Sequence, residues 1–214
     1  MRLRRQNGEV RRPVTIRSRL LASMALISLV GISAGSGTWA AFTATTANGG
    51  DRFESGSVAI GDNDGGSTPM LSLAAAIPGA TDTGCIKVTY TGSLPSTVRL
   101  YGTTTGTGLD QYLDLKVTRG TYTPSDPGFD SCTNFQPDAT EYIVGKGNGV
   151  VYDGTLQGFP DSYAGGVVNP TAGTPESWTN NEVHVYKVQV TLQNNLAAEN
   201  KNATQSFTWE AQSQ

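Results

Sequence analysis

The chain has 214 residues, of which only 15% are charged, and it contains 26 glycines. This length fits one domain plus a leader, and the abundance of Thr, Gly, Val and Ser favours β-structure over helix. Seven of the 15 basic residues but only one of the 18 acidic residues lie within residues 1–40. Residues 41–214 therefore contain 8 basic and 17 acidic residues, which gives them a net charge of about −9. Such an acidic body is a poor match for nucleic-acid-binding or anionic-membrane-binding proteins.

The first 40 residues have the three parts of a secretory signal peptide. Residues 1–19 are rich in arginine, residues 20–37 are apolar with many small residues, and further small residues lead to Ala40 and Ala41. This order predicts a helical signal peptide that is cleaved between Ala40 and Ala41. The apolar run reaches a membrane-spanning length only if its Gly and Ser residues are included, so cleavage is favoured over a permanent anchor. We therefore expect a signal peptide at 1–40, a folded domain at 41–214, and membrane contact only through the uncleaved leader.

Short segments with strand-like patterns follow the leader. We expect strands at residues 41–46, 53–60, 85–91, 96–101, 113–118, 142–144, 150–152, 178–192 and 206–210, and short helical turns or loops near residues 109–113, 156–163 and 194–202. Within residues 178–192, Tyr186 and Val188 share one face, whereas Val183 and Val185 lie on the other, which indicates a bulge or burial on both sides at one end. The many short strands, with no β-α-β alternation, predict an all-β fold: a two-sheet jelly-roll-like β-sandwich with short helical turns in its loops.

The two cysteines, Cys85 and Cys132, both lie in the folded part. An even number of cysteines in an exported chain indicates one disulfide. The alternative is a free or metal-binding pair, but no histidine or third cysteine lies near either of them in the sequence. The bridge would tie the loop-rich residues 120–139 to a strand.

The chain contains few of the motifs that enzymes require. It has one histidine, His184, so an H-E-x-x-H zinc site is impossible, and it has no G-x-S-x-G elbow and no Walker loop. We therefore expect neither enzymatic activity nor an organic cofactor. Asp62 and Asp64, in the sequence Asp-Asn-Asp-Gly, are spaced like the oxygen ligands of a calcium loop, but Asn, Asp and Gly also favour a plain turn. Both interpretations of this loop remain open.

Several segments resemble the TasA/camelysin family of secreted bacterial proteins. The first is G-T-W-A-A-F at residues 37–42, which is similar to the end of the family's signal peptides, and F-E-S-G-S-V-A-I at residues 53–60 follows it. Further similarities are Pro78-Gly79, V-T-Y-T-G-S-L-P at residues 88–95, the segment 178–192 and the closing segment 206–211. These matches cover both ends and the middle of the folded part, whereas the cysteine pair and the loops at 120–175 depart from the family pattern.

The resemblance implies an exported jelly-roll sandwich whose signal peptide is removed by a dedicated signal peptidase. For fibre-forming members it implies assembly in which the N-terminal strand of one subunit completes a sheet of the next. In this chain the donor strand would consist of Ala41, Phe42, Thr43, Ala44, Thr45 and Thr46. An open sheet edge suits this role, since main-chain hydrogen bonds provide the affinity. We thus expect a secreted, extracellular structural protein of the cell surface or biofilm matrix that self-associates into oligomers or fibres.

Two other functions are compatible with export. One is a camelysin-like protease, against which the single histidine argues. The other is a carbohydrate- or ligand-binding sandwich that uses Trp178, Tyr163 and Tyr152 as an aromatic platform, although such aromatic residues are more often part of a core.

Overall fold

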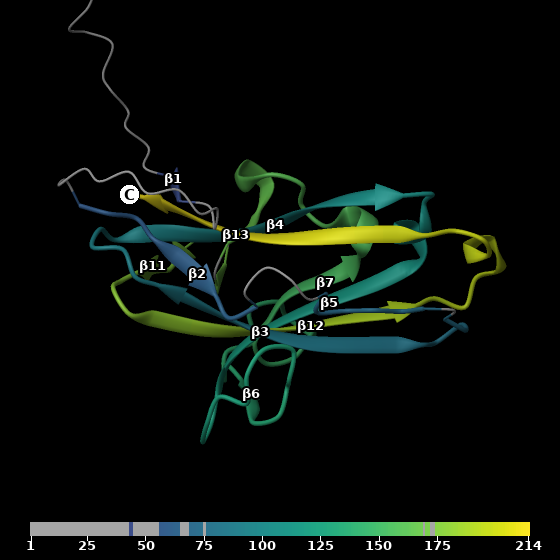
Figure 1. Cartoon of the computed structure of the whole chain (residues 1–214), viewed down its shortest axis with the longest axis horizontal. Coiled ribbons are helices and arrows are strands. Elements are labelled where there is room, and N and C mark those ends of the chain that lie inside the picture. The colour runs from purple at the N-terminus through teal and green to yellow at the C-terminus, as the bar shows by residue number, and fades with distance from the viewer. Residues whose placement is uncertain (1–42, 45–55, 65–68, 75, 169, 172–173) are drawn as a thin grey trace, which may run out of the picture. The chain divides into compact units, whose positions relative to one another are not determined.

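The computed structural model describes residues 43–44, 56–64, 69–74, 76–168, 170–171 and 174–214. The chain divides into two units, Met1–Ala40 and Ala41–Gln214, and every described residue belongs to the second. That unit is an all-β sandwich of two antiparallel sheets, as expected (Figure 1). Among the described residues, no helix has both the length and the apolar character needed to cross a membrane.

The first sheet has the strand order β1-β13-β4-β11, and β8 also pairs with β4. Its members are β1 (Thr43–Ala44), β4 (Ser96–Gly106), β8 (Val167–Val168), β11 (Ser177–Trp178) and β13 (Ala203–Ser213). β13 and β4 are paired over eleven residues, from Ala203 opposite Gly106 to Ser213 opposite Ser96. This long pair forms one layer of the sandwich (Figure 1).

The second sheet has the order β2-β3-β12-β5-β6, and β7 also pairs with β5. Its members are β2 (Ile60–Asp62), β3 (Thr81–Tyr90), β5 (Leu113–Tyr122), β6 (Phe135–Pro137), β7 (Val150–Thr155) and β12 (Glu182–Leu192). The connections contain a small hairpin of β9 (Pro170–Thr171) and β10 (Thr174–Pro175) and the short 3₁₀ helices η1 (Leu109–Tyr112), η2 (Leu156–Gly158), η3 (Tyr163–Gly165) and η4 (Leu196–Ala198). The expected short helical turns are therefore present.

Alternating apolar residues on the central strands build the core. Side by side in the second sheet, Val188 of β12 lies opposite Val117 of β5, and Val190 lies opposite Leu115. All four are at most 7% exposed, as is Trp209 of β13 in the other layer. Since burial of a Val or Leu side chain contributes about 1.5–3 kcal/mol, this register is strongly specified: a slip of one residue would turn the apolar face outward.

Three predicted strands need correction. Residues 142–144 do not form a strand, because Glu141 accepts hydrogen bonds from the backbone N–H groups of Gly145 and Gly147 and closes a turn there. In the predicted strand 53–60, residues 53–55 lie outside the described residues and 56–59 are not assigned to a strand, so β2 begins only at Ile60.

The predicted strand 178–192 is two strands, β11 and β12, which belong to different sheets. A turn separates them, and Asn181 in this turn has a left-handed backbone with φ of 66°. β12 itself has a continuous register with β3, so it contains no bulge there. The change of face reflects burial on both sides instead, because Val185 and Tyr186 are both 2% exposed.

Candidate functional site

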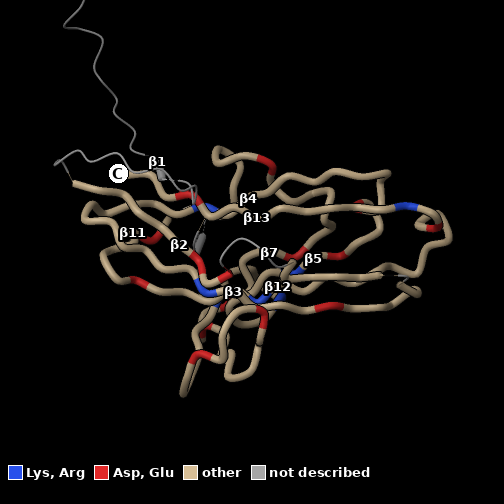
Figure 2. The backbone as a smooth tube through the Cα atoms, in the orientation of Figure 1, with Lys and Arg blue, Asp and Glu red and all other residues tan. Residues whose placement is uncertain are grey.

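Within the described part of the chain, the outer edge of β13 is long and mostly unpaired. Of the described residues, only those of β1 pair with it, Thr43 opposite Gln212 and Ala44 opposite Ala211. Residues 203–210 therefore have β4 on one side and no described strand on the other. β13 contains no Lys and no Pro, and Glu210 is its one charged residue (Figure 2). Since edges are usually protected by such residues, this edge is suited to receive another strand.

The outer edge of β3, in the other sheet, is closed by loop contacts. The Cys85 N–H donates to the Asp130 carbonyl at 3.4 Å, and the Asp130 N–H donates to the Cys85 carbonyl at 3.0 Å. The Lys87 N–H donates to Asn63 Oδ1 at 2.9 Å, and β2 covers residues 88–90. The two sheets therefore differ in how well their edges are protected.

The free hydrogen-bonding groups on β13 can be assigned from the opposite side of the sheet. The Gly102 N–H of β4 donates to the Pro160 carbonyl at 2.9 Å, so it points away from β13. Its register partner on β13 is Phe207. In an antiparallel pair, the backbone N–H and C=O groups of two opposite residues either both point toward the paired strand or both point away from it, and the two cases alternate along the strand. The backbone N–H and C=O groups of Gln205, Phe207 and Trp209 therefore face the open edge.

Two hollows lie along the same edge. The first, of about 310 Å³, opens between β2 and β13, and its lining includes Ile60, Asp62, Phe207 and Trp209. The second, of about 370 Å³, opens farther along β13 and is more apolar. It is lined by residues of 69–76, η1, η2 and three strands, among them Met70, Leu113, Leu156, Val190, Leu192, Gln205 and Phe207. An added strand would place alternate side chains toward these hollows.

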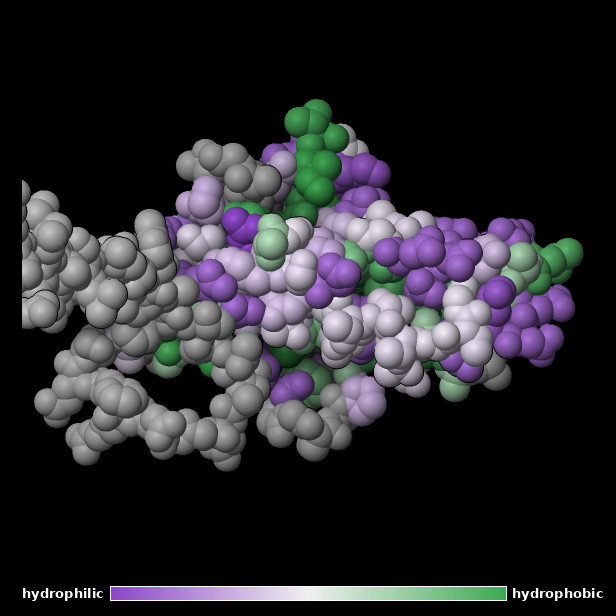
Figure 3. Space-filling model, turned by 90° about the horizontal axis from the view of Figure 1, so that it is seen from above, coloured by the Kyte–Doolittle hydropathy of each residue, from purple (hydrophilic) through white to green (hydrophobic). Residues whose placement is uncertain are grey.

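The surface above this layer has no broad apolar patch in the view of Figure 3. It is mostly pale or hydrophilic, and the apolar areas are small and separate. This face therefore offers no flat apolar contact to a partner in this view, which leaves main-chain hydrogen bonds and the hollows at the edge of β13 as the means to hold an added strand.

Only part of the predicted donor strand can be placed. Thr43 and Ala44 form β1, whereas Ala41, Phe42, Thr45 and Thr46 lie outside the described residues. The predicted cleavage site at Ala40 and Ala41 also lies outside them. The described part of the donor segment thus lies at the C-terminal end of β13, beside the open edge.

The predicted disulfide between Cys85 and Cys132 is confirmed, with 5.1 Å between the two Cα atoms. Cys85 is fully buried on β3. The bridge holds the excursion between β5 and β6 against the edge of β3, next to the hydrogen bonds of Asp130. The same loop that the bridge restrains therefore also closes that edge.

Asp62 and Asp64 lie at the end of β2. The Asp64 N–H donates to Asp62 Oδ1 at 3.3 Å, as in an Asx turn, and burial together with the Asp64 side chain raises the pKa of Asp62. Within the described part of the chain, no third His, Cys, Asp or Glu forms a metal-binding group with them. Calcium binding at this turn stays a prediction.

The suggested aromatic platform does not form as a unit. Trp178 is fully buried and belongs to the core, whereas Tyr163 and Tyr152 are half-buried. The Tyr163 ring lies 5.0 Å from the Arg99 guanidinium, and Tyr152 packs edge-on against Phe159 at 4.9 Å.

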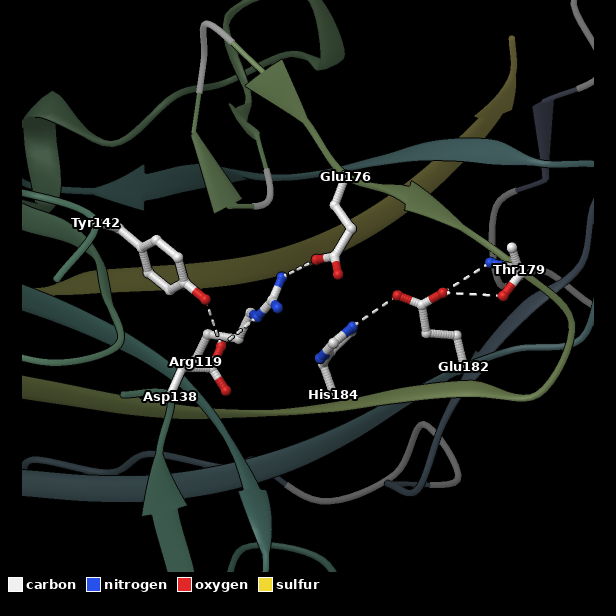
Figure 4. A network of polar contacts seen from close by, with 7 residues as sticks. All are labelled: Arg119, Asp138, Tyr142, Glu176, Thr179, Glu182 and His184. Atoms are coloured by element: carbon white, nitrogen blue, oxygen red, sulfur yellow. Dashed lines mark hydrogen bonds and ion pairs between the residues drawn. The ribbon is translucent and has the colours of Figure 1, made fainter. Parts of the chain in front are cut away.

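A polar cluster surrounds Arg119 of β5 (Figure 4). Arg119 is only 6% exposed, its Nε donates to Asp138 at 2.5 Å, and its Nη1 forms an ion pair with Glu176. Asp138 also accepts from the Tyr142 hydroxyl at 2.8 Å. Burial, followed by this hydrogen bond, raises the pKa of Tyr142 to about 12. Burial opposes the charge of Arg119, but the bonds to Glu176 and Asp138 outweigh it and raise its pKa.

Glu182 and His184 continue the cluster on β12. His184 Nε2 lies 3.0 Å from Glu182 Oε1, while Glu182 Oε2 accepts from the Thr179 N–H at 2.8 Å and from its hydroxyl at 3.3 Å. The His184 ring packs against Trp178 with 4.5 Å between ring centroids. One donor atom each from Glu176, Glu182 and His184 lies within 4.8 Å of the other two. Geometrically, this group can hold a cation.

The sequence contains one signal for this cluster. Glu182 and His184 are spaced by two, so they share the face of Tyr186, which is buried. Polar residues at inward-facing positions of a strand need partners, and this pattern marks them as candidates. Glu176, Arg119 and Asp138 come from other segments and give no comparable signal. No family model matches the chain, and comparison with curated proteins finds no significant relative.

Proposed function

We propose that this protein is a secreted structural protein of the bacterial cell surface or biofilm matrix, which self-associates when the N-terminal strand of one copy adds to β13 of another. The observation that carries the proposal is the outer edge of β13, where residues 203–210 have no described strand on the side away from β4. The proposal also includes export, with removal of residues 1–40 by a signal peptidase. The similarity of residues 37–42 and 53–60 to TasA/camelysin proteins supports it from the sequence side.

The donor and the acceptor are different segments of the chain, so the proposed contact is directional. The donor segment, residues 41–46, is at the start of the folded part, and the acceptor is near its end. A copy that donates its first strand still has its own β13 free to receive the next strand. Such a contact is head-to-tail and does not close, so it can propagate into a fibre.

The acceptor can provide both affinity and specificity. Gln205, Phe207 and Trp209 present main-chain groups for hydrogen bonds with an added strand. The hollows of about 310 and 370 Å³ can accept alternate side chains of that strand. Because the edge of β3 is closed, strand addition at β13 is favoured over addition at β3. The net charge of about −9 on each copy opposes association, so assembly should increase with salt.

The test uses three chains that begin at different residues: the full chain, a chain from Ala41 and a chain from Ala47, which lacks the donor segment. Sedimentation velocity and negative-stain electron microscopy should show oligomers or fibres for the chain from Ala41 and monomers for the chain from Ala47. N-terminal sequencing of secreted protein should begin at or next to Ala41. Equal assembly of the chain from Ala47 would refute donation of this strand.

Substitutions at Gln205 test the acceptor with a matched control. Gln205→Pro removes an N–H that faces the open edge but is not needed for pairing with β4, so assembly should fall. Gln205→Ala removes the same side chain and keeps the N–H, so assembly should persist. If both variants assemble like the wild type, the edge of β13 is not the acceptor.

A further inference from the structure

The group formed by Glu176, Glu182 and His184 links the two sheets of the sandwich. Glu176 directly precedes β11 of the first sheet, whereas Glu182 and His184 lie on β12 of the second. Their donor atoms lie within 4.8 Å of one another. Around tetrahedral Zn²⁺, neighbouring ligand atoms are about 3.4 Å apart, so small side-chain movements would bring all three onto one ion.

Contacts outside the group already orient its carboxylates. Glu182 is held through Oε2 by the backbone and hydroxyl of Thr179, which leaves Oε1 directed at His184. Glu176 is held through Oε2 by Arg119, and its other oxygen points toward the space beside His184 (Figure 4). Hydrogen bonds to the far oxygen of a carboxylate are typical of the outer contacts that support metal ligands.

The charge around this group favours a cation. Asp138 and Glu176 both pair with the Arg119 guanidinium, whereas Glu182 lies against His184, so three carboxyl groups with side chains only 18–36% exposed gather near one guanidinium. The His184 side chain is 12% exposed, and its Nδ1 is buried with no hydrogen-bond partner among the described residues. The nitrogen that faces the carboxylates is Nε2, 3.0 Å from Glu182 Oε1, so the ring would bind an ion through Nε2, and Nδ1 is not part of the site.

We propose that Glu176, Glu182 and His184 bind one divalent transition-metal ion of the Zn²⁺ type. An imidazole with two carboxylates suits Zn²⁺ better than Ca²⁺ or Mg²⁺, which prefer oxygen ligands alone. The ion joins β12 to the segment before β11 and so clamps the two sheets together at this end of the sandwich. Water completes the coordination. The site does not depend on strand addition at β13, and either can exist without the other.

The chain is well suited to a direct test, because His184 is its one histidine and Cys85 and Cys132 are bonded to each other. The full chain, without an affinity tag, is titrated with ZnCl₂ by isothermal calorimetry, with CaCl₂ in parallel. We expect one Zn²⁺ per chain and at least about tenfold weaker binding of Ca²⁺. X-ray absorption of the Zn²⁺-loaded protein should show a single imidazole among oxygen ligands, and the ring signals of His184 in NMR spectra should shift until one equivalent has been added.

Variants assign the ligands. His184→Gln and Glu182→Gln should each weaken Zn²⁺ binding at least about tenfold. Glu199→Gln, the same change at an exposed site, should leave binding unchanged, as should Asp62→Asn. Circular dichroism confirms that each variant is folded, and the NMR titration of the wild type needs no variant. Absence of imidazole from the Zn²⁺ shell, unchanged His184 signals, or loss of binding in Asp62→Asn but not in His184→Gln would overturn the proposal.

Discussion

Removal of the disulfide should destabilise the protein by about 3–4 kcal/mol. The bridge closes a loop of 47 residues, for which the chain-entropy account gives about 4 kcal/mol at 25 °C. The measured value should be somewhat lower, because the unfolded chain remains partly compact without the bridge. With a urea dependence of about 2 kcal/mol per M, the midpoint of unfolding should fall by about 1.5–2 M.

The assay is urea unfolding of a Cys85→Ala/Cys132→Ala double variant, followed by tryptophan fluorescence. Trp178 is fully buried and Trp209 is 6% exposed, so unfolding should change the signal clearly. Wild-type protein reduced with dithiothreitol is the matched control and should lose a similar amount. A loss that appears in the variant but not in the reduced protein would show that the alanine side chains, rather than the bridge, are responsible.

The same variant should also expose the edge of β3. The two backbone hydrogen bonds between residue 85 and Asp130 depend on the loop that carries Cys132. Hydrogen exchange at the amide of residue 85 should therefore become faster, and the variant should self-associate more than the wild type. A stability loss below about 1 kcal/mol, with the amide still protected, would refute the view that the bridge secures this loop and edge.

Three further predictions concern buried groups. Arg119→Met should lower the free energy of unfolding by about 3 kcal/mol, because it leaves two carboxylates without their partner. Lys146→Met, which removes an exposed ion pair of 3.3 Å, should lower it by less than about 1 kcal/mol, and urea unfolding compares the two variants. The Tyr142 hydroxyl should lose its proton at about pH 12 in the folded state but near pH 10 in the unfolded chain, so its contribution to stability should be lost as the pH rises through that window. Ultraviolet titration of the wild type and of Tyr142→Phe measures this, and the same number of late-titrating tyrosines in both proteins would contradict it. Leu115→Ala, at 1% exposure, should cost about 2–4 kcal/mol, whereas Leu196→Ala, at 81% exposure, should be nearly neutral; equal midpoints of thermal unfolding would contradict the core assignment.

Local pattern was sufficient to predict most of the long strands and the fold class. The alternation within residues 85–91 and 113–118 appears in β3 and β5, because the side chains of a strand alternate between two faces whatever the strand pairs with. Residues 109–112 form the expected helical turn, and Cys85 pairs with Cys132. Each of these features depends on neighbouring residues or on a simple count.

The same local reasoning failed where side chains act on a distant or irregular backbone. Residues 142–144 have strand-like composition, but the Glu141 carboxylate binds two N–H groups and holds a turn. The apparent single strand at 178–192 is divided by a turn at Asn181, which sends Trp178 into one sheet and Tyr186 into the other. Apolar pattern alone does not distinguish one long strand from two that face the same core.

The sequence by itself determined the fold class, most of the long strands and the cysteine pair, because these follow from residue periodicity and number. Only the tertiary structure decided which edges are covered and which polar groups meet. Among the described residues, the edge of β3 is covered by β2 and by the loop that Cys132 anchors, whereas residues 203–210 of β13 have no strand on their outer side. Likewise, Glu176 reaches His184 only because β11 and β12 fold into opposite sheets, and contacts between distant segments follow from chain topology, which periodicity does not encode.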